Sequence, residues 1–90
     1  MRVTVNHEYI YYPNLLDRID GRTSLVPGDV VRVINLPGCP PANTMGHCYV
    51  GERETGKFLG MVHTNSLHPL SDAKLVIARI KEDIARQEVA

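Results

Sequence analysis

Residues 25–70 read LVPGDVVRVINLPGCPPANTMGHCYVGERETGKFLGMVHTNSLHPL and carry most of the information about the fold. Apolar runs alternate here with a proline- and glycine-rich loop and with a tight turn, which predicts strand, long loop, strand, turn, strand and short helical turn in that order. This order predicts a mainly β fold, a small half-open barrel of about five strands. The same residues include both cysteines and three of the four histidines, so any chemistry of the chain is expected there too.

Three strands are expected inside this stretch. Residues 30–34 are almost all apolar, which is typical of a strand that is covered on both faces. Residues 45–53 and 57–63 are joined by a turn at Gly56 and are expected to pair as a hairpin. Gly60 lies in the middle of the second of these strands, where a glycine indicates a bulge or a close approach of another backbone.

The flanking residues supply one more strand and a helix. Residues 2–12 alternate and are rich in β-branched and aromatic side chains, which predicts a strand. Residues 15–19 fit either one helical turn or an irregular loop. Residues 72–88 are predicted to form a C-terminal helix with Ser71 or Asp72 as its N-cap. Leu75 lies off the apolar stripe of this helix, which consists of Ala73, Val76, Ile77, Ile80 and Ile84.

Length and composition indicate one domain covering residues 1–90. A chain of 90 residues, 43% of them hydrophobic, can bury a single modest core. No apolar run approaches the roughly 18 residues that a membrane span needs, and the N-terminus lacks the apolar core of a signal peptide. A cytoplasmic protein without a membrane partner is therefore expected. In that compartment two cysteines are expected to be free thiols.

Charge argues against nucleic acid as a partner. The chain has ten basic and ten acidic residues, whereas neutralising phosphates requires a basic excess. The alternative is a local basic strip, and scattered solvated charges are the simpler interpretation. Such a strip would contain Arg18, Arg22, Arg32, Arg53 and Lys57.

Two segments of the chain resemble an SH3 domain. GKFLGMVHTNSLHPL, at residues 56–70, looks like the distal hairpin strand, the glycine-led strand, the one-turn 3₁₀ helix and the closing strand of that family. PGDVVRV, at residues 27–33, looks like the strand that follows its first long loop. The resemblance covers residues 25–70, about half of the chain, and it implies an SH3-like β-barrel. Because such barrels also occur in RNA- and ribosome-associated modules, it leaves an RNA-associated function open.

The resemblance does not extend to the peptide-binding groove of SH3 domains. That groove needs a tryptophan, a tyrosine pair, and a proline and a tyrosine around the 3₁₀ turn. This chain has no tryptophan, and His63 and Ser66 stand where the proline and the tyrosine are expected. Binding of a polyproline helix in the SH3 manner is therefore not expected.

Soft metal ligands are concentrated in the same stretch. The candidates are Cys39, His47, His63 and His68. His63 and His68 have a spacing that zinc ligands use, but the arrangement as a whole matches no zinc motif. His47 and Cys48 are adjacent on a strand and point to opposite faces, so one site would rarely use both. Core packing of one of them, with the other histidines on the surface, is the simpler interpretation.

A cysteine–histidine nucleophile is the second chemical alternative. It would combine Cys39 with His63 or His68, and Asn65 could orient the imidazole. A domain of this size has little room for a substrate pocket beside such a site, unless subunits build it together from Cys39, His47 and His63. The simpler interpretation of Cys39 is a cysteine in a proline-rich turn. A protein that binds a metal or a small molecule at a site of Cys39, His47 and His63, or an enzyme that uses this site, is thus the alternative function. The sequence favours no enzyme and points to no cofactor.

Exposed apolar residues favour an interaction module. Residues 9–12, Leu59, Met61 and the helix stripe exceed what a small barrel easily covers, and such patches mark interfaces. We therefore expect a non-catalytic binding or assembly module that acts as a homo-oligomer, simplest as a two-fold dimer, with a protein partner possible. A helix that folds back over its own barrel is the competing prediction. The expected contact surface combines the proline-rich loop and the turn after residue 62, namely Leu36, Pro37, Cys39, Pro40, Pro41, Asn43, His63, Asn65 and His68.

Overall fold

The computed structural model describes residues 3–20 and 23–89, and these residues form a mainly β fold with one five-stranded antiparallel sheet and a C-terminal helix. The fold class predicted from the sequence is confirmed, and the arrangement is compatible with an SH3-like fold. The strand order in the sheet is β4-β3-β2-β1-β5. The elements are β1 (Glu8–Tyr11), α1 (Leu15–Asp20), β2 (Val30–Ile34), the 3₁₀ turn η1 (Thr44–Gly46), β3 (His47–Glu52), β4 (Phe58–His63), η2 (Thr64–Ser66), β5 (Leu67–Pro69), η3 (Leu70–Asp72) and α2 (Ala73–Val89).

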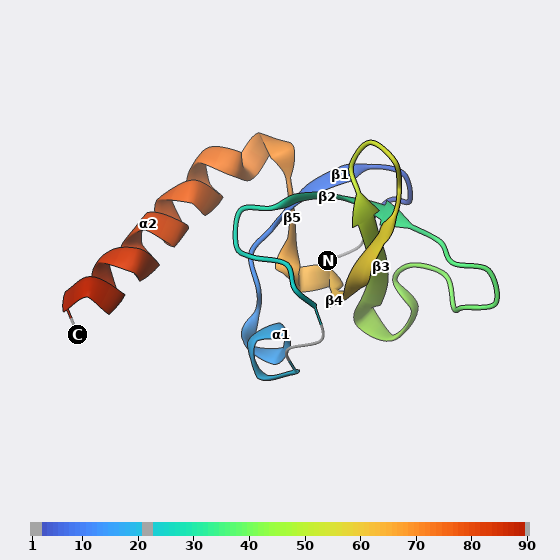
Figure 1. The fold of residues 1–90 in the computed structure, drawn as a ribbon, viewed down its shortest axis with the longest axis horizontal. Coiled ribbons are helices and arrows are strands. Elements are labelled where there is room, and N and C mark those ends of the chain that lie inside the picture. The colour runs from blue at the N-terminus through green and yellow to red at the C-terminus, as the bar shows by residue number, and fades with distance from the viewer. Residues whose placement is uncertain (1–2, 21–22, 90) are drawn as a thin grey trace.

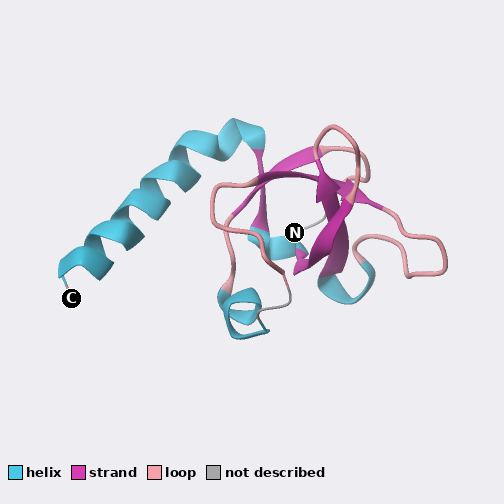
Figure 2. Cartoon of the chain, in the orientation of Figure 1, coloured by secondary structure: helices cyan, strands magenta, loops and turns pink. Residues whose placement is uncertain are grey.

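In the sheet, strand β1 lies between β2, the next strand along the chain, and β5, the last strand. It pairs with β2, where Tyr9 lies opposite Val31, and on its other side with β5, where Tyr9 lies opposite Pro69. The sheet curls around its interior, and the strands enclose most of the core (Figure 2). The proline-rich loop after β2 and the helix α2 project on opposite sides of this sheet (Figure 1).

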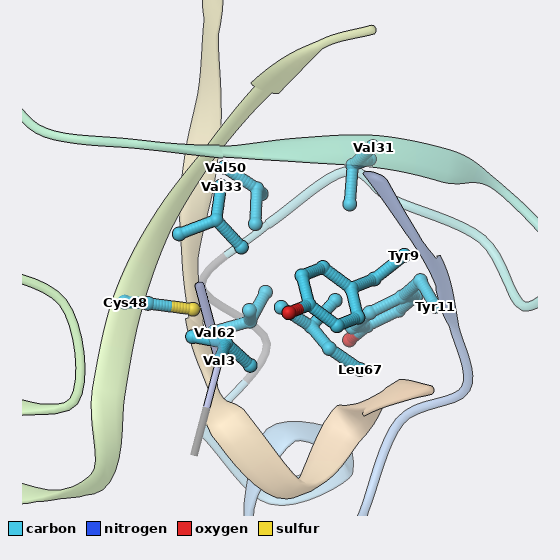
Figure 3. Close-up of a cluster of buried hydrophobic side chains, with 9 residues drawn as sticks. All are labelled: Val3, Tyr9, Tyr11, Val31, Val33, Cys48, Val50, Val62 and Leu67. Atoms are coloured by element: carbon cyan, nitrogen blue, oxygen red, sulfur yellow. The ribbon is translucent and has the colours of Figure 1, made fainter. Parts of the chain in front are cut away.

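The inner face of the sheet holds the core (Figure 3). Strands β2 and β3 alternate, with one side chain inward and the next outward, as period-two strands do. Burial of each large aliphatic side chain contributes roughly 1.5–3 kcal/mol to folding. The core residues are Val3, Tyr9, Tyr11, Val31, Val33, Cys48, Val50, Val62 and Leu67.

Two strands are shorter than the sequence predicts because the backbone turns at a positive φ. The strand expected over residues 2–12 is limited to β1, since Asn6 has a φ of 69° and interrupts it; Arg2 lies outside the described residues. The strand expected from residue 45 begins at His47, since Met45 has a φ of 55° inside η1. Residues 15–19 belong to the helix α1, which decides between the two alternatives left by the sequence.

Other local predictions divide in the same way. Gly60 lies beside the register irregularity of the β3–β4 pairing, where Val50 is opposite Gly60 and Gly51 is opposite Phe58, which agrees with the bulge alternative. The close neighbour of Gly60 is a side chain and not a backbone, because a Cβ built on Gly60 would lie 2.6 Å from the Thr23 Oγ1. Strand β2 is buried at Val31 and Val33 on one face and partly buried at the other positions, so its second face is covered in part. The sequence predicts an N-cap at Ser71 or Asp72. Both residues belong to η3, and helix α2 begins directly after them at Ala73.

The tyrosine-rich end of β1 is also more deeply buried than expected. Tyr9, Ile10 and Tyr11 are each less than a tenth exposed, so they belong to the chain's own interior and not to an external patch. Burial, with a smaller contribution from Asp17, raises the pKa of Tyr11 to about 12. The prediction that this segment contributes to an exposed apolar patch is therefore wrong for Tyr9, Ile10 and Tyr11.

Helix α2 leaves the sheet and presents most of its surface to solvent (Figure 1). Val76 is buried, at 2% exposure, whereas Ile77 and Ile84 are 44% and 49% exposed. The competing prediction, in which the barrel absorbs the whole stripe, is therefore wrong. Among the helices of residues 3–20 and 23–89, none combines the length and the apolar character needed to cross a bilayer.

Candidate functional site

A half-open, mostly apolar pocket of about 250 Å³ lies between the proline-rich loop and the outer face of the β3–β4 hairpin. The hairpin supplies residues that point away from the core, because alternate residues of β3 face outward. Tyr49 and Met61 lie opposite each other in the register and form its floor. The lining consists of Pro40, Pro41, Thr44, Met45, His47, Tyr49 and Met61.

Asn43 holds the loop that makes the other wall. Its side-chain oxygen accepts from the Val3 N–H at 2.7 Å, and its amide donates to the Val3 carbonyl at 2.9 Å. Its own N–H donates to the His47 carbonyl at 3.0 Å. Asn43 has a φ of 71°, a left-handed conformation that asparagine tolerates better than most residues. The pocket wall is thus fixed by bonds to the N-terminal segment and to β3.

Met45 is the most exposed apolar side chain of the pocket. It is 89% exposed and follows Asn43 and Thr44 in the same turn. A long thioether side chain in such a place contributes almost nothing to the core, yet it adapts its shape to a bound group. Met45 on the loop side and Met61 in the floor therefore give the pocket two adaptable side chains.

Polar groups lie at the edge of the pocket. The His47 and His63 rings are in contact, with centroids 4.3 Å apart, and His47 lines the pocket. A hydrogen bond with Cys39 raises the pKa of Tyr49, so the exposed thiol of the proline-rich loop lies beside the pocket floor. These groups can orient a ligand through hydrogen bonds.

Asp17 is the centre of a second, buried cluster. Its carboxylate is 6% exposed and accepts from the His63 backbone N–H at 3.2 Å. It also contacts the His63 Nδ1 and accepts from the Ser66 hydroxyl. Ser66 in turn accepts from the Asn14 N–H at 2.9 Å. His63 belongs to β4, Ser66 to η2, and Asn14 to the loop before α1. The cluster therefore holds α1 against β4 and η2.

The Asp17 cluster has the residue types of a serine–histidine–aspartate triad but not its arrangement. In a triad the hydroxyl meets the imidazole, and the carboxylate lies behind the imidazole. Here the serine and the histidine both contact Asp17, and Ser66 is completely buried, at 0% exposure. The hydroxyl therefore cannot reach a substrate. The cluster instead stabilises the fold through buried hydrogen bonds.

The sequence-derived metal candidates meet only in part. His47 and His63 do come together, but His68 lies on β5 beside the Tyr12 ring, with centroids 6.4 Å apart. Within the described part of the chain, no group of three histidine, cysteine or acidic residues is arranged to hold a metal ion. His68 is partly buried, and that burial, together with the nearby Arg79, lowers its pKa against the opposing effect of Asp72.

The two cysteines have different surroundings. Cys48 is in the core, where burial, followed by the Asp17 charge, raises its pKa to about 12. Cys39 is exposed, and its contact is with Tyr49. A thiolate needs a lowered pKa to act as a nucleophile, so Cys48 is chemically inert.

Two basic residues of the strip expected from the sequence lie beside acidic residues. Arg53 pairs with Glu8 at 3.1 Å, and Arg18 lies 3.8 Å from Asp83. Arg22 lies outside the described residues. Two of the five residues of the expected strip, Arg18 and Arg53, therefore have an acidic side chain beside them.

The contact surface predicted from the sequence overlaps the pocket at Pro40 and Pro41. Asn43 supports the wall from behind, and His63 contacts the pocket residue His47. Thr44, Met45 and Tyr49 are site residues that were not predicted from the sequence, and the role of Asp17 was not predicted either. The glycine after Met45 is consistent with a turn there, but no local pattern in the sequence points to Asp17.

Comparisons of this chain with protein-family models, with curated proteins and with solved structures found no match.

Proposed function

We propose that this chain is a non-catalytic binding module on an SH3-like barrel, and that it accepts one apolar side chain of a protein partner in the pocket beside the proline-rich loop. The observation that carries the proposal is the pocket itself, apolar and half-open, with a floor of Tyr49 and Met61.

The size of the pocket supports a side chain as its ligand. Pockets for small molecules have volumes of roughly 300–1,000 Å³, and this one, at about 250 Å³, is comparable to the smallest of them. One aromatic or long aliphatic group fills such a space. The open mouth leaves the rest of a peptide outside, against the loop and the hairpin.

The construction of the walls also supports binding. Pro40 and Pro41 restrict the backbone, and Asn43 ties the loop to Val3, so little conformational entropy is lost when a ligand enters. The side chains of Met45 and Met61 adapt to the shape of the ligand. A rigid frame with an adjustable lining is typical of surfaces that bind more than one sequence.

This mode differs from that of peptide-binding SH3 domains. Ser66, which stands where the resemblance expects the groove tyrosine, is buried and bonded to Asp17. The proposed site uses the outer face of β3 and β4 in place of that groove.

A peptide selection tests the proposal. The full chain is immobilised and used to select from a random phage-displayed peptide library, and enriched peptides are titrated by fluorescence anisotropy. We expect the peptides to share one aromatic or long aliphatic residue. The Met45→Glu variant should bind them at least about tenfold more weakly, the usual cost of altering a central contact.

A matched control variant distinguishes binding in this pocket from nonspecific binding to exposed apolar side chains. Leu15→Glu changes an apolar side chain that is 71% exposed on α1, outside the pocket, and its affinity should equal that of the unmodified chain. Because Met45 is 89% exposed, Met45→Glu should leave the free energy of unfolding within about 0.5 kcal/mol. Equal binding of the selected peptides by Met45→Glu, or a selection that enriches no peptide, contradicts the proposal.

A further inference from the structure

The pocket wall contains an imidazole whose nitrogens are available to a ligand. His47 lies on the outer face of β3, two residues before Tyr49, and lines the pocket. Among residues 3–20 and 23–89, its ring contacts the His63 ring, and no side chain or backbone group forms a hydrogen bond with its nitrogens. A neutral imidazole has one donor and one acceptor nitrogen, so His47 offers both to a group that enters the pocket.

The other polar groups of the lining are already supplied with partners or with water. The Tyr49 hydroxyl takes part in a hydrogen bond with the Cys39 thiol. Thr44 is an exposed residue, so water reaches its hydroxyl, whereas His47 is half-buried. The imidazole of His47 is therefore the polar group of the lining that a bound side chain most readily seals from water.

The ring of His47 is also held in position by a chain of contacts that begins in the buried cluster. The His47 and His63 ring centroids are 4.3 Å apart, and the ring planes are inclined at 45°. The Nδ1 of His63 contacts the Asp17 carboxylate, whose side chain is only 6% exposed. Because the His63 ring is fixed by Asp17, it restricts the positions open to the His47 ring, which lowers the entropy that His47 loses when a ligand binds.

We propose, on the basis of the function proposed above, that the side chain bound in the pocket is an aromatic ring carrying a hydrogen-bond donor, that is tyrosine or tryptophan. His47 selects this side chain by accepting a hydrogen bond from its O–H or N–H. A purely apolar side chain would cover the imidazole and leave it without a partner, and a buried polar group without a partner weakens binding. A site that hydrogen-bonds a hydroxyl group therefore discriminates against the analogue that lacks it.

The apolar part of the lining suits an aromatic ring. The thioethers of Met45 and Met61 make favourable contacts with the edges of aromatic rings. Tyr49 supplies a ring to the floor and already contacts the Phe58 ring, with centroids 6.2 Å apart. Aromatic pairs favour offset or edge-to-face arrangements of this kind. Tyrosine and tryptophan also lose little conformational entropy on binding, because each has only two rotatable side-chain bonds.

A series of peptides tests the proposal on the unmodified chain. A peptide enriched in the selection described above is synthesised with tyrosine, tryptophan, phenylalanine or leucine at the shared position, and each version is titrated by fluorescence anisotropy. The tyrosine version should bind about three- to tenfold more tightly than the phenylalanine version, the usual effect of one neutral hydrogen bond. The leucine version should bind more weakly than the tyrosine version as well.

Two variants of the chain identify the group that makes this distinction. His47→Phe keeps a ring beside His63 and removes both nitrogens, so the ratio of the affinities for the tyrosine and phenylalanine peptides should fall to about one. Thr44→Val is the matched control, because it removes the hydroxyl of another polar lining residue and nearly preserves its shape. This variant should keep the ratio of the unmodified chain. Circular dichroism checks that both variants are folded.

Nuclear magnetic resonance provides a second measurement that needs no variant. In the unmodified chain, the tyrosine peptide should shift the resonance of one ring nitrogen of His47 more than the phenylalanine peptide does, because only the tyrosine peptide brings a donor to it. Equal shifts with the two peptides would show that the imidazole does not bind the hydroxyl, and they overturn the proposal.

The outcomes distinguish this proposal from the function on which it rests. A selection that enriches no peptide, or equal binding by Met45→Glu, contradicts the proposed function itself. If Met45→Glu does weaken binding, three results overturn the role of His47 alone: equal affinities for the tyrosine and phenylalanine peptides, a preference that survives His47→Phe, or a preference that is lost in Thr44→Val. Selected peptides that share an aliphatic residue also overturn it.

Discussion

Asp17 and Met45 invert the usual relation between polarity and burial. The Asp17 carboxylate is 6% exposed and lies among backbone and side-chain donors, whereas the Met45 side chain is 89% exposed on a pocket wall. A buried carboxylate is stable only where its acceptor positions are satisfied, and an exposed thioether costs the fold little. The Asp17 region therefore holds the chain together, and the Met45 region is free to contact other molecules.

The strongest test of this contrast removes the buried carboxylate. Asp17→Ala leaves the His63 N–H and the Ser66 hydroxyl without their acceptor, and each buried unsatisfied donor costs about 1–3 kcal/mol. We expect the free energy of unfolding to fall by about 3 kcal/mol in urea denaturation followed by circular dichroism. Leu15→Ala, at a side chain 71% exposed on the same helix, should cost less than about 1 kcal/mol. Similar midpoints for the two variants would show that the Asp17 cluster does not hold α1.

A smaller effect is expected at Asn43, which links the binding region to the core. Asn43→Ala removes both bonds to Val3 and places alanine at a φ of 71°, so a loss of about 2 kcal/mol is expected in thermal unfolding. Asn43→Gly also removes the bonds but tolerates the backbone conformation, so its loss should be about 1 kcal/mol. If glycine costs as much as alanine, the backbone conformation of Asn43 contributes nothing and the side-chain bonds account for the whole effect.

The smallest effect concerns His68, at the junction of β5 and α2. Burial lowers its pKa below the ordinary value of 6.5, so on acidification the unfolded chain takes up this proton before the folded chain does. The contribution of His68 to stability is thus intact above pH 6.5 and is lost as the pH falls below it. His68→Gln should flatten the decrease in melting temperature between about pH 7.5 and pH 5.5. An unchanged pH dependence in His68→Gln would assign that decrease to other groups.

Local patterns predicted the parts of the fold that depend on neighbouring residues. The strands β2 and β3, the hairpin turn before β4 and the C-terminal helix α2 were all predicted from the sequence, and the structure confirms them. The register irregularity beside Gly60 was also predicted, because a glycine inside a strand indicates a bulge. Each of these features depends on period, propensity or a turn residue.

The remaining features depend on residues far apart in the chain. Asp17 stands in an ordinary helical turn, and its importance arises only because folding brings His63 and Ser66 to it. Strand β1 begins only at Glu8 because Asn6 adopts a positive φ, which an asparagine permits but does not require. A contact surface at the proline-rich loop was predicted from the sequence, but the pocket beside that loop depends on the register that sets Tyr49 opposite Met61.

The pairing of β1 with β5 has a consequence for the time course of synthesis. Tyr9 must meet Pro69, and Tyr11 must meet Leu67, so the sheet cannot close until nearly the whole strand sequence has left the ribosome. Until then the tyrosines of β1 lack the partner that buries them, and the nascent chain exposes an aromatic strand edge. Contacts of such long separation also slow folding relative to helical proteins of the same length. The emergence of residues 67–69 therefore sets the earliest moment at which this protein can be native.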